Sequence, residues 1–98
     1  MEPITVFKVL ANKTRLQILQ WLKVPAEHFS ADAIKPEVGV CVGDIQKKAG
    51  LAQSTVSHYL AMLESAGFVI ATREGQWTYY RRNEAIFHEL AELVKSEI

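Results

Sequence analysis

The stretch Q-S-T-V-S-H-Y-L-A-M-L-E-S-A-G, residues 53–67, organises the rest of the chain. Its apolar side chains Val56, Leu60 and Leu63 recur at the spacing of one helix face. The opposite arc carries small or short polar side chains, namely Ser54, Ser57, His58, Ala61 and Ser65. An ordinary solvated helix face carries Lys and Glu, whereas short polar groups suit a surface that lies close against nucleic-acid base edges.

A short helix and a glycine turn precede this stretch. Residues 44–49 predict a helix with Ile45 and Ala49 facing inward, and Gly50 supplies the left-handed turn after it. Leu51 is expected to plug that turn. A helix, a short turn with glycine and a second helix with a polar outer face together predict a helix-turn-helix.

Two β-rich runs follow. Residues 68–73 (F-V-I-A-T-R) and 77–82 (W-T-Y-Y-R-R) flank a turn that contains glycine, which predicts a β-hairpin. The polar side chains expected at its tip are Arg73, Gln76 and Arg81. Such a tip is typical of a β-wing that touches the DNA backbone or minor groove, and a plain surface hairpin is the alternative.

Residues 4–10 (I-T-V-F-K-V-L) are nearly all apolar and predict a first helix. Ile4, Phe7 and Leu10 are expected to face the core, which leaves Val6 and Val9 in need of other cover. A second subunit would supply that cover, whereas a terminal strand or a frayed helix is the alternative.

A second helix is predicted over 13–22, with Asn12 as its N-cap and Pro25 ending it. Its inward side chains are expected to be Leu16, Leu19 and Leu22. Lys13 and Arg15 are predicted either to meet phosphates or to form ordinary solvated surface.

Residues 25–38 show the weakest pattern and predict a long loop, and 38–42 predict a short extended piece. At the other end, Asn83 is expected to cap a last helix over 84–97. Its apolar arc is too wide for one small domain to bury: Ile86, Phe87, Leu90, Leu93, Val94 and Ile98. Together with the first helix, this arc predicts a homodimer.

Length and composition favour one globular domain spanning 1–98, with 49% hydrophobic residues. No apolar run approaches the roughly 20 residues that span a bilayer, and no signal peptide is expected. The single cysteine, Cys41, excludes an internal disulfide and fits a reducing cytoplasm.

The net charge is zero, but its distribution is uneven. Five Lys/Arg against four Asp/Glu give +1 for residues 1–43, and five against three give +2 for 44–82. One against four gives −3 for 83–98. A mildly basic middle and an acidic tail permit nucleic-acid binding without requiring it.

The order of these elements resembles the ArsR family of winged-helix repressors. Four blocks carry the resemblance: L-A-N-K-T-R-L-Q-I-L at 10–19, C-V-G-D-I at 41–45, residues 53–69 and R-E-G-Q-W-T-Y-Y at 73–80. The implied fold is mainly α with a small β-wing: a winged helix-turn-helix of about five helices and a two- to three-stranded antiparallel sheet. It would dimerise through its N- and C-terminal helices.

The resemblance also implies a function. It describes a cytoplasmic, dimeric repressor that binds a palindromic operator in double-stranded DNA and leaves it when an effector binds. By position, the residues that would meet DNA are Gln53, Ser54, Thr55, Ser57 and His58 on the reading helix and Arg73, Gln76 and Arg81 on the wing. Thr55 lies nearest the buried side of its helix and is the weakest of these candidates.

The effector is left open. Metal-sensing family members place two cysteines where this chain has Cys41 and Gly43, so that site is incomplete. Cys41 is interpreted as a buried hydrophobe, as a thiol-reactive sensor, or as a metal ligand with other side chains. The metal candidates beside it are His28, Asp32, Glu37 and His88.

Two other function classes are weighed. A winged helix that lost DNA and became a protein-interaction module would explain the zero net charge. An enzyme is the weakest class, because the sequence shows no paired nucleophile and base and no glycine-rich phosphate loop.

Overall fold

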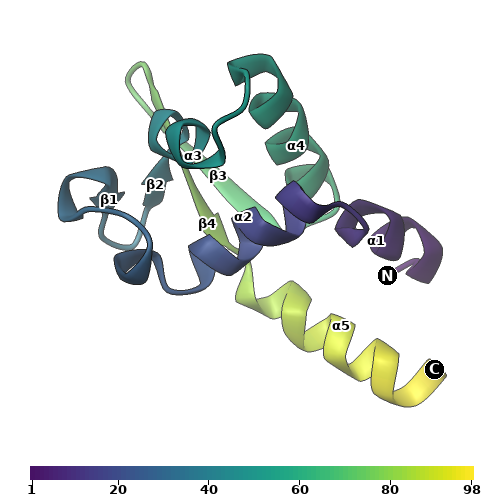
Figure 1. Cartoon of the computed structure of the whole chain (residues 1–98). Helices are drawn as coiled ribbons and strands as arrows, with labels where there is room; N and C mark the ends of the chain where they lie inside the picture. Colours follow the sequence, from purple (N-terminus) through teal and green to yellow (C-terminus); the bar gives the residue numbers. More distant parts are fainter.

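The computed structural model describes residues 1–98 and contains five α-helices and one four-stranded antiparallel sheet (Figure 1). The first half of the chain runs α1 (Pro3–Leu10), α2 (Lys13–Lys23), the 3-10 turns η1 (Pro25–Glu27) and η2 (Ala31–Ala33), β1 (Ile34–Lys35) and β2 (Gly39–Cys41). The second half runs α3 (Val42–Ala49), α4 (Gln53–Ser65), β3 (Val69–Glu74), β4 (Trp77–Arg82) and α5 (Glu84–Glu97). This is the predicted winged helix-turn-helix.

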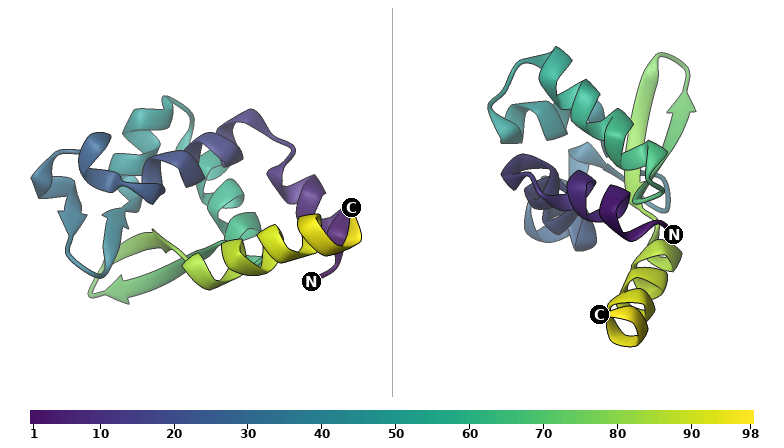
Figure 2. Two further views of the ribbon diagram at one scale, coloured as in Figure 1. Left: turned by 90° about the horizontal axis from the view of Figure 1, so that it is seen from below. Right: turned by 90° about the vertical axis from the view of Figure 1, so that its right-hand side faces the viewer.

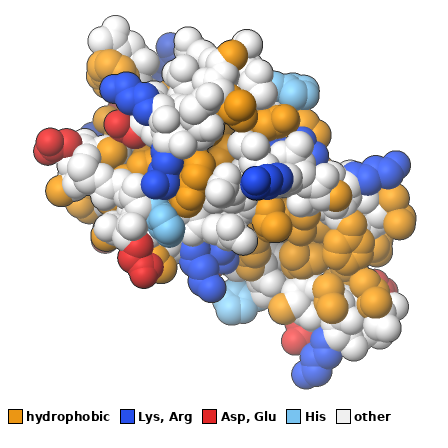
Figure 3. Space-filling model, in the orientation of Figure 1, with side chains coloured by type: hydrophobic (Ala, Val, Ile, Leu, Met, Phe, Trp, Pro, Cys, Tyr) orange, Lys and Arg blue, Asp and Glu red, His pale blue; other side chains and the backbone are white.

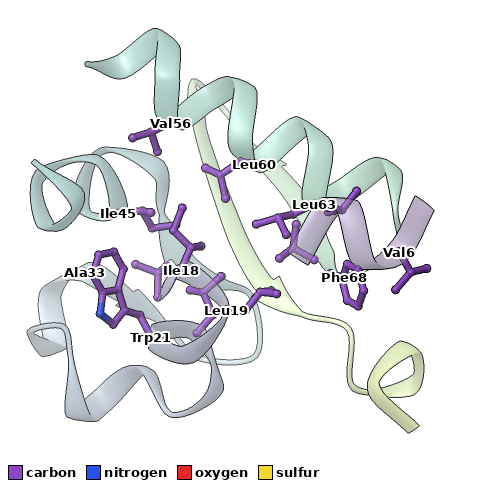
Figure 4. Packing of buried hydrophobic residues seen from close by; sticks show 14 residues of the cluster. Val6, Ile18, Leu19, Trp21, Ala33, Ile45, Val56, Leu60, Leu63 and Phe68 are labelled. Atoms are coloured by element: carbon purple, nitrogen blue, oxygen red, sulfur yellow. The ribbon is translucent and has the colours of Figure 1, made fainter. Parts of the chain in front are cut away.

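The apolar stripe of α4 anchors the core. Val56, Leu60 and Leu63 are all 0% exposed and point from α4 toward side chains of α2 and α3 (Figure 4). Their partners include Ile18 and Ile45, which are also 0% exposed. The period read from the sequence is therefore confirmed as the buried face of α4.

The end of α4 is closed by Gly67, whose φ of 86° places it in the left-handed region. The Phe68 N–H donates to the Leu63 carbonyl and the Gly67 N–H to the Glu64 carbonyl, so two carbonyls left over by the helix end are satisfied. Asn83 lies at the start of α5 as predicted, but its side chain makes no cap. Its Nδ2 donates to the Gly67 carbonyl at 2.9 Å and ties α5 to the end of α4.

The sheet has the order β1-β2-β4-β3, one or two strands more than predicted. Val40 lies opposite Tyr80, and the two-residue strand β1 adds to the outer side of β2. A turn joins β1 to β2, with the Val38 N–H donating to the Lys35 carbonyl and Glu37 at a positive φ of 66°. The predicted loop over 25–38 is thus wrong, because two 3-10 turns and a strand occupy most of it.

Two inward faces were predicted only in part, although Leu10, Leu19 and Leu22 pack inward as expected. On α1, Val6 and Val9 are buried while Ile4 is 61% exposed. On α2, Leu16 is 44% exposed, and Trp21 lies in the core instead. Both helices have apolar residues on more than one stripe. The way α1 crosses α2 decides which stripe is buried, and the periodicity of the sequence cannot decide it.

The helix α5 passes the N-terminal part of α1, and its C-terminal turns extend beyond the body of the domain (Figure 2). Its first turns pack on the core through Ile86, Phe87 and Leu90, but Val94 and Ile98 are 45% and 77% exposed. No α5 residue is buried, as its wide apolar arc led us to expect. No helix of the structure has the length and apolar character that crossing a membrane would require.

Gly39 generates a prediction about the sheet. A Cβ on Gly39 would lie 2.2 Å from the Tyr80 carbonyl oxygen, and its φ of 131° disfavours any other residue. Gly39→Ala is therefore expected to lower the free energy of unfolding by about 3 kcal/mol. The control Gly43→Ala adds a Cβ within α3 with no atom within 4 Å, and should be neutral or stabilise by up to about 1 kcal/mol. Urea denaturation at one fixed protein concentration measures both, and equal midpoints would contradict the clash.

Candidate nucleic-acid interface

The turn between α3 and α4 is built by Gly50, which has φ 67° and ends α3. Ile45 and Ala49 pack inward from α3 as predicted. Leu51 does not plug the turn, because its side chain is 38% exposed. Gln46 holds the turn instead: its carbonyl accepts from the Gly50 N–H at 3.0 Å, and its Nε2 donates to the Leu51 carbonyl at 3.5 Å.

The outer arc of α4 is bare. Ser54, Ser57 and His58 are exposed, as are Gln53 at the start of the helix and Ala61 one turn further on. No ion pair of the structure involves this arc. It is therefore a convex surface of short hydrogen-bonding groups, free to approach a flat or grooved ligand closely.

Two residues at the edges of the arc stand apart from it. Thr55 is half-buried and lies toward the core side, in keeping with its position beside Tyr59. Ala52 holds the N-cap position with extended backbone but offers no side-chain cap to the first N–H groups of α4. The first turn of α4 therefore keeps free donors at the end that the macrodipole makes positive.

Arg15 is the only charged side chain among the buried residues, at 7% exposed. It is therefore neither a phosphate contact nor solvated surface, and both sequence-based alternatives are wrong for it. Its Nε donates to the Val9 carbonyl at 2.6 Å and its Nη2 to the Lys8 carbonyl at 3.2 Å. Its guanidinium carbon lies 5.2 Å from the ring centre of Tyr59 on α4.

The wing is the β3–β4 hairpin, closed by the pair Glu74–Trp77 with Gly75 at φ 63°. Arg73 and Gln76 are exposed at its tip, as predicted. Arg73 Nε donates to the Gly75 carbonyl at 3.3 Å, so the guanidinium is held against the turn.

Arg81 does not lie at the tip. It pairs with Ile70 near the base of the hairpin, about 13 Å from Trp77 at the usual rise per strand residue. It lines a groove together with Lys35 and Glu37 from the β1–β2 segment. The predicted place at the tip is wrong, because Arg81 follows Trp77 by four residues along β4 and each residue moves it further from the turn.

Two side chains at or near the wing were not predicted from the sequence. Lys35 reaches from β1 to an ion pair with Glu74, and the hydrogen bond that its ammonium donates to this carboxylate raises the pKa of Lys35. Trp77 is 54% exposed beside the tip. No local pattern in the sequence shows this ion pair, since its partners lie 39 residues apart and β1 has no strand signal of its own.

The metal interpretation of Cys41 gains no support from the side chains of one chain. No group of three His, Cys, Asp or Glu side chains is close enough to hold a metal, including the candidates His28, Asp32, Glu37 and His88. Cys41 is a free, half-buried thiol at the N-cap of α3, so it is not a fully buried hydrophobe either.

Comparison with known proteins bears on this geometry. The family described as bacterial regulatory protein, arsR family, matches residues 40–71, which run from β2 through the helix-turn-helix into β3. An uncharacterized HTH-type transcriptional regulator, YbzH of Bacillus subtilis (strain 168), is 50% identical over 100 residues and covers 100% of both chains. The chain belongs to the ArsR family.

A repressor and a solved DNA-binding domain are also similar to this ArsR-family chain. The arsenical resistance operon repressor of Escherichia coli (strain K12) is 32% identical over 81% of this chain, which spans 57% of that protein. The solution structure of a homodimeric winged helix-turn-helix DNA-binding domain from Mycobacterium bovis is 35% identical. It superposes with a TM-score of 0.63 over 96% of this chain and 78% of that one.

These findings fix the general function of the ArsR-family chain. It is a winged-helix transcriptional regulator with a DNA-binding domain. Its relatives are regulators and not enzymes. The interaction-module alternative loses its support, because zero net charge alone does not outweigh this membership.

The uncapped start of α4 generates a prediction about stability. Ala52→Ser would place a hydroxyl where it can accept from the free N–H groups of the first turn, so unfolding should cost about 1 kcal/mol more. The control Ala91→Ser adds the same hydroxyl at an exposed position in the interior of α5. It should lower the free energy of unfolding by about 0.5 kcal/mol. Thermal unfolding at matched concentration tests both, and a loss at both positions would contradict the missing cap.

Proposed function

We propose that the chain is a homodimeric cytoplasmic repressor that reads an imperfect palindrome and leaves it when an effector binds. The observation that carries this proposal is the bare, uncharged arc of α4 beside a wing with a cationic tip. An arc of this kind fits the major groove, where base edges present donors and acceptors at close range. The repressor named among the relatives supports the direction of regulation.

The reading residues we propose are Ser54, Ser57 and His58, which lie central on the exposed arc of α4. Their hydroxyl and imidazole groups both donate and accept hydrogen bonds, so they can match base edges. Gln53 and Thr55, at the margins, divide between base and phosphate. The free N–H groups at the uncapped start of α4 add a site for a backbone phosphate.

The wing contacts we propose are Arg73 and Gln76. Arg73 supplies the positive charge that a phosphate or a narrow minor groove attracts, and its bond to the turn limits the freedom it loses on binding. Arg81 is left out of this set, because the hairpin register holds it away from the tip.

The dimer we propose uses α1 and α5. Hydrophobic side chains gather in the angle between these helices (Figure 3). A groove there is lined by Thr5, Val6 and Ile86, and the same two helices carry the exposed apolar side chains Ile4 and Val94. A second copy would cover this surface, and its two-fold axis would present two α4 helices to major grooves about 34 Å apart. The homodimeric relative supports this arrangement.

The effector is not specified by the site. Cys41 occupies the N-cap position of α3, the helix just before α4, so a reaction at its thiol would act on the reading unit. A thiol-reactive sensor at Cys41 stays a prediction.

His58→Ala tests sequence reading. Removing a base-edge contact is expected to weaken binding to a selected operator duplex by about 1–3 kcal/mol, with little change on a random duplex. His28→Ala removes an exposed histidine far along the chain from α4 and serves as the matched control. Fluorescence anisotropy with both duplexes measures the difference. Equal losses on the two duplexes would remove His58 from the reading set.

Arg73→Ala tests the wing. Losing one phosphate contact should weaken binding to both duplexes alike and lower the slope of log K against log salt by about one. Arg81→Ala removes the same charge from the base of the hairpin and should leave the slope unchanged. A salt titration of each variant supplies the slopes, and an unchanged slope for Arg73→Ala would place the wing away from DNA.

A further inference from the structure

The buried arginine joins three helices. Arg15 belongs to α2, donates to the end of α1 and lies against the ring of Tyr59 on α4. A buried charge is costly unless its hydrogen-bonding groups are satisfied. Because Arg15 is only 7% exposed, the groups that accept its hydrogen bonds must stay in place around it.

The acceptors for Arg15 are the two carbonyls that α1 leaves free. At the end of α1, the Ala11 N–H donates to Phe7 and the Asn12 N–H donates to Leu10. The carbonyls of Lys8 and Val9 lie between them and receive the guanidinium. The planar fork matches two adjacent carbonyls, and its charge complements the negative end of the helix dipole.

The third contact reaches the reading helix. The Tyr59 ring lies 5.2 Å from the guanidinium carbon, at a distance typical of a cation–π contact. Tyr59 follows His58 directly in α4, and the centres of their rings lie 6.4 Å apart. Only the Tyr59 side chain therefore separates Arg15, which binds the end of α1, from His58 on the exposed arc of α4.

We propose that Arg15 is a positioning residue for operator reading, which fixes α4 relative to α1 through Tyr59. This inference rests on the proposed function. If α1 forms part of the dimer contact, the Arg15–Tyr59 link sets the distance and tilt between the two reading helices. That distance determines which spacing of half-sites the dimer accepts. Arg15 carries its charge at every relevant pH, so the link is permanent.

The test uses a duplex that the wild-type dimer selects from a random-sequence library, and a copy with one base pair added between the half-sites. Arg15→Lys keeps the charge but loses the fork, and Tyr59→Leu removes the ring. Each should lower affinity for the selected duplex about tenfold and shrink the penalty for the added base pair, while binding to random DNA changes less than about twofold. Tyr59→Phe keeps the ring face and is the matched control. Sedimentation confirms that each variant is a folded dimer.

The double variant separates positioning from stability. Because Arg15 and Tyr59 act as one link, the double variant should bind the selected duplex about as weakly as the weaker single variant. Losses that multiply, equal losses on selected and random DNA, or an unchanged spacing penalty would each overturn the link. If Arg15→Lys fails to fold, equal affinity of Tyr59→Leu and Tyr59→Phe overturns it. If the wild type selects no sequence, the proposed function fails, and the link fails with it. If all variants bind a selected palindrome equally well, only the Arg15–Tyr59 link is overturned.

Discussion

The rest of the structure depends on the burial of one face of α4. Val56, Leu60 and Leu63 are fully enclosed by α2, α3 and the sheet, and the opposite arc of the helix is exposed to solvent. A helix of thirteen residues gains little from its own hydrogen bonds in water, so its order comes from this packing. The core can therefore present an arc that makes no stabilising contacts of its own, which leaves that arc free for recognition.

Local patterns predicted the elements whose physics is local. The period of α4, the left-handed glycines at 50 and 67 and the Asn12 cap all act within a few residues, and each was found as expected. Elements fixed by distant contacts were not predicted. A two-residue strand such as β1 carries no period, and it exists because β2 offers it an unpaired edge. The inward face of α1 depends on how it crosses α2, and its own composition leaves that undecided.

The candidate site divides in the same way. The reading arc follows from one helix, so Ser54, Ser57 and His58 were found exposed as expected. The wing requires the register of two strands, and Arg81 was misplaced by that register. Arg15 requires three helices at once, and a lone arginine near a helix start looks like surface in any sequence. A buried arginine becomes visible only when the carbonyls that receive it are assembled.

The short strand β1 has a consequence for how the protein behaves in a crowded cell. Without it, β2 would be a sheet edge with free N–H and C=O groups, open to pairing with another chain. β1 covers that edge with only two residues, one of them a lysine, and Pro36 follows at once. A strand so short, charged and broken by proline is a poor template for further pairing. The segment before β2 thus protects the sheet against aggregation while leaving the hairpin tip free.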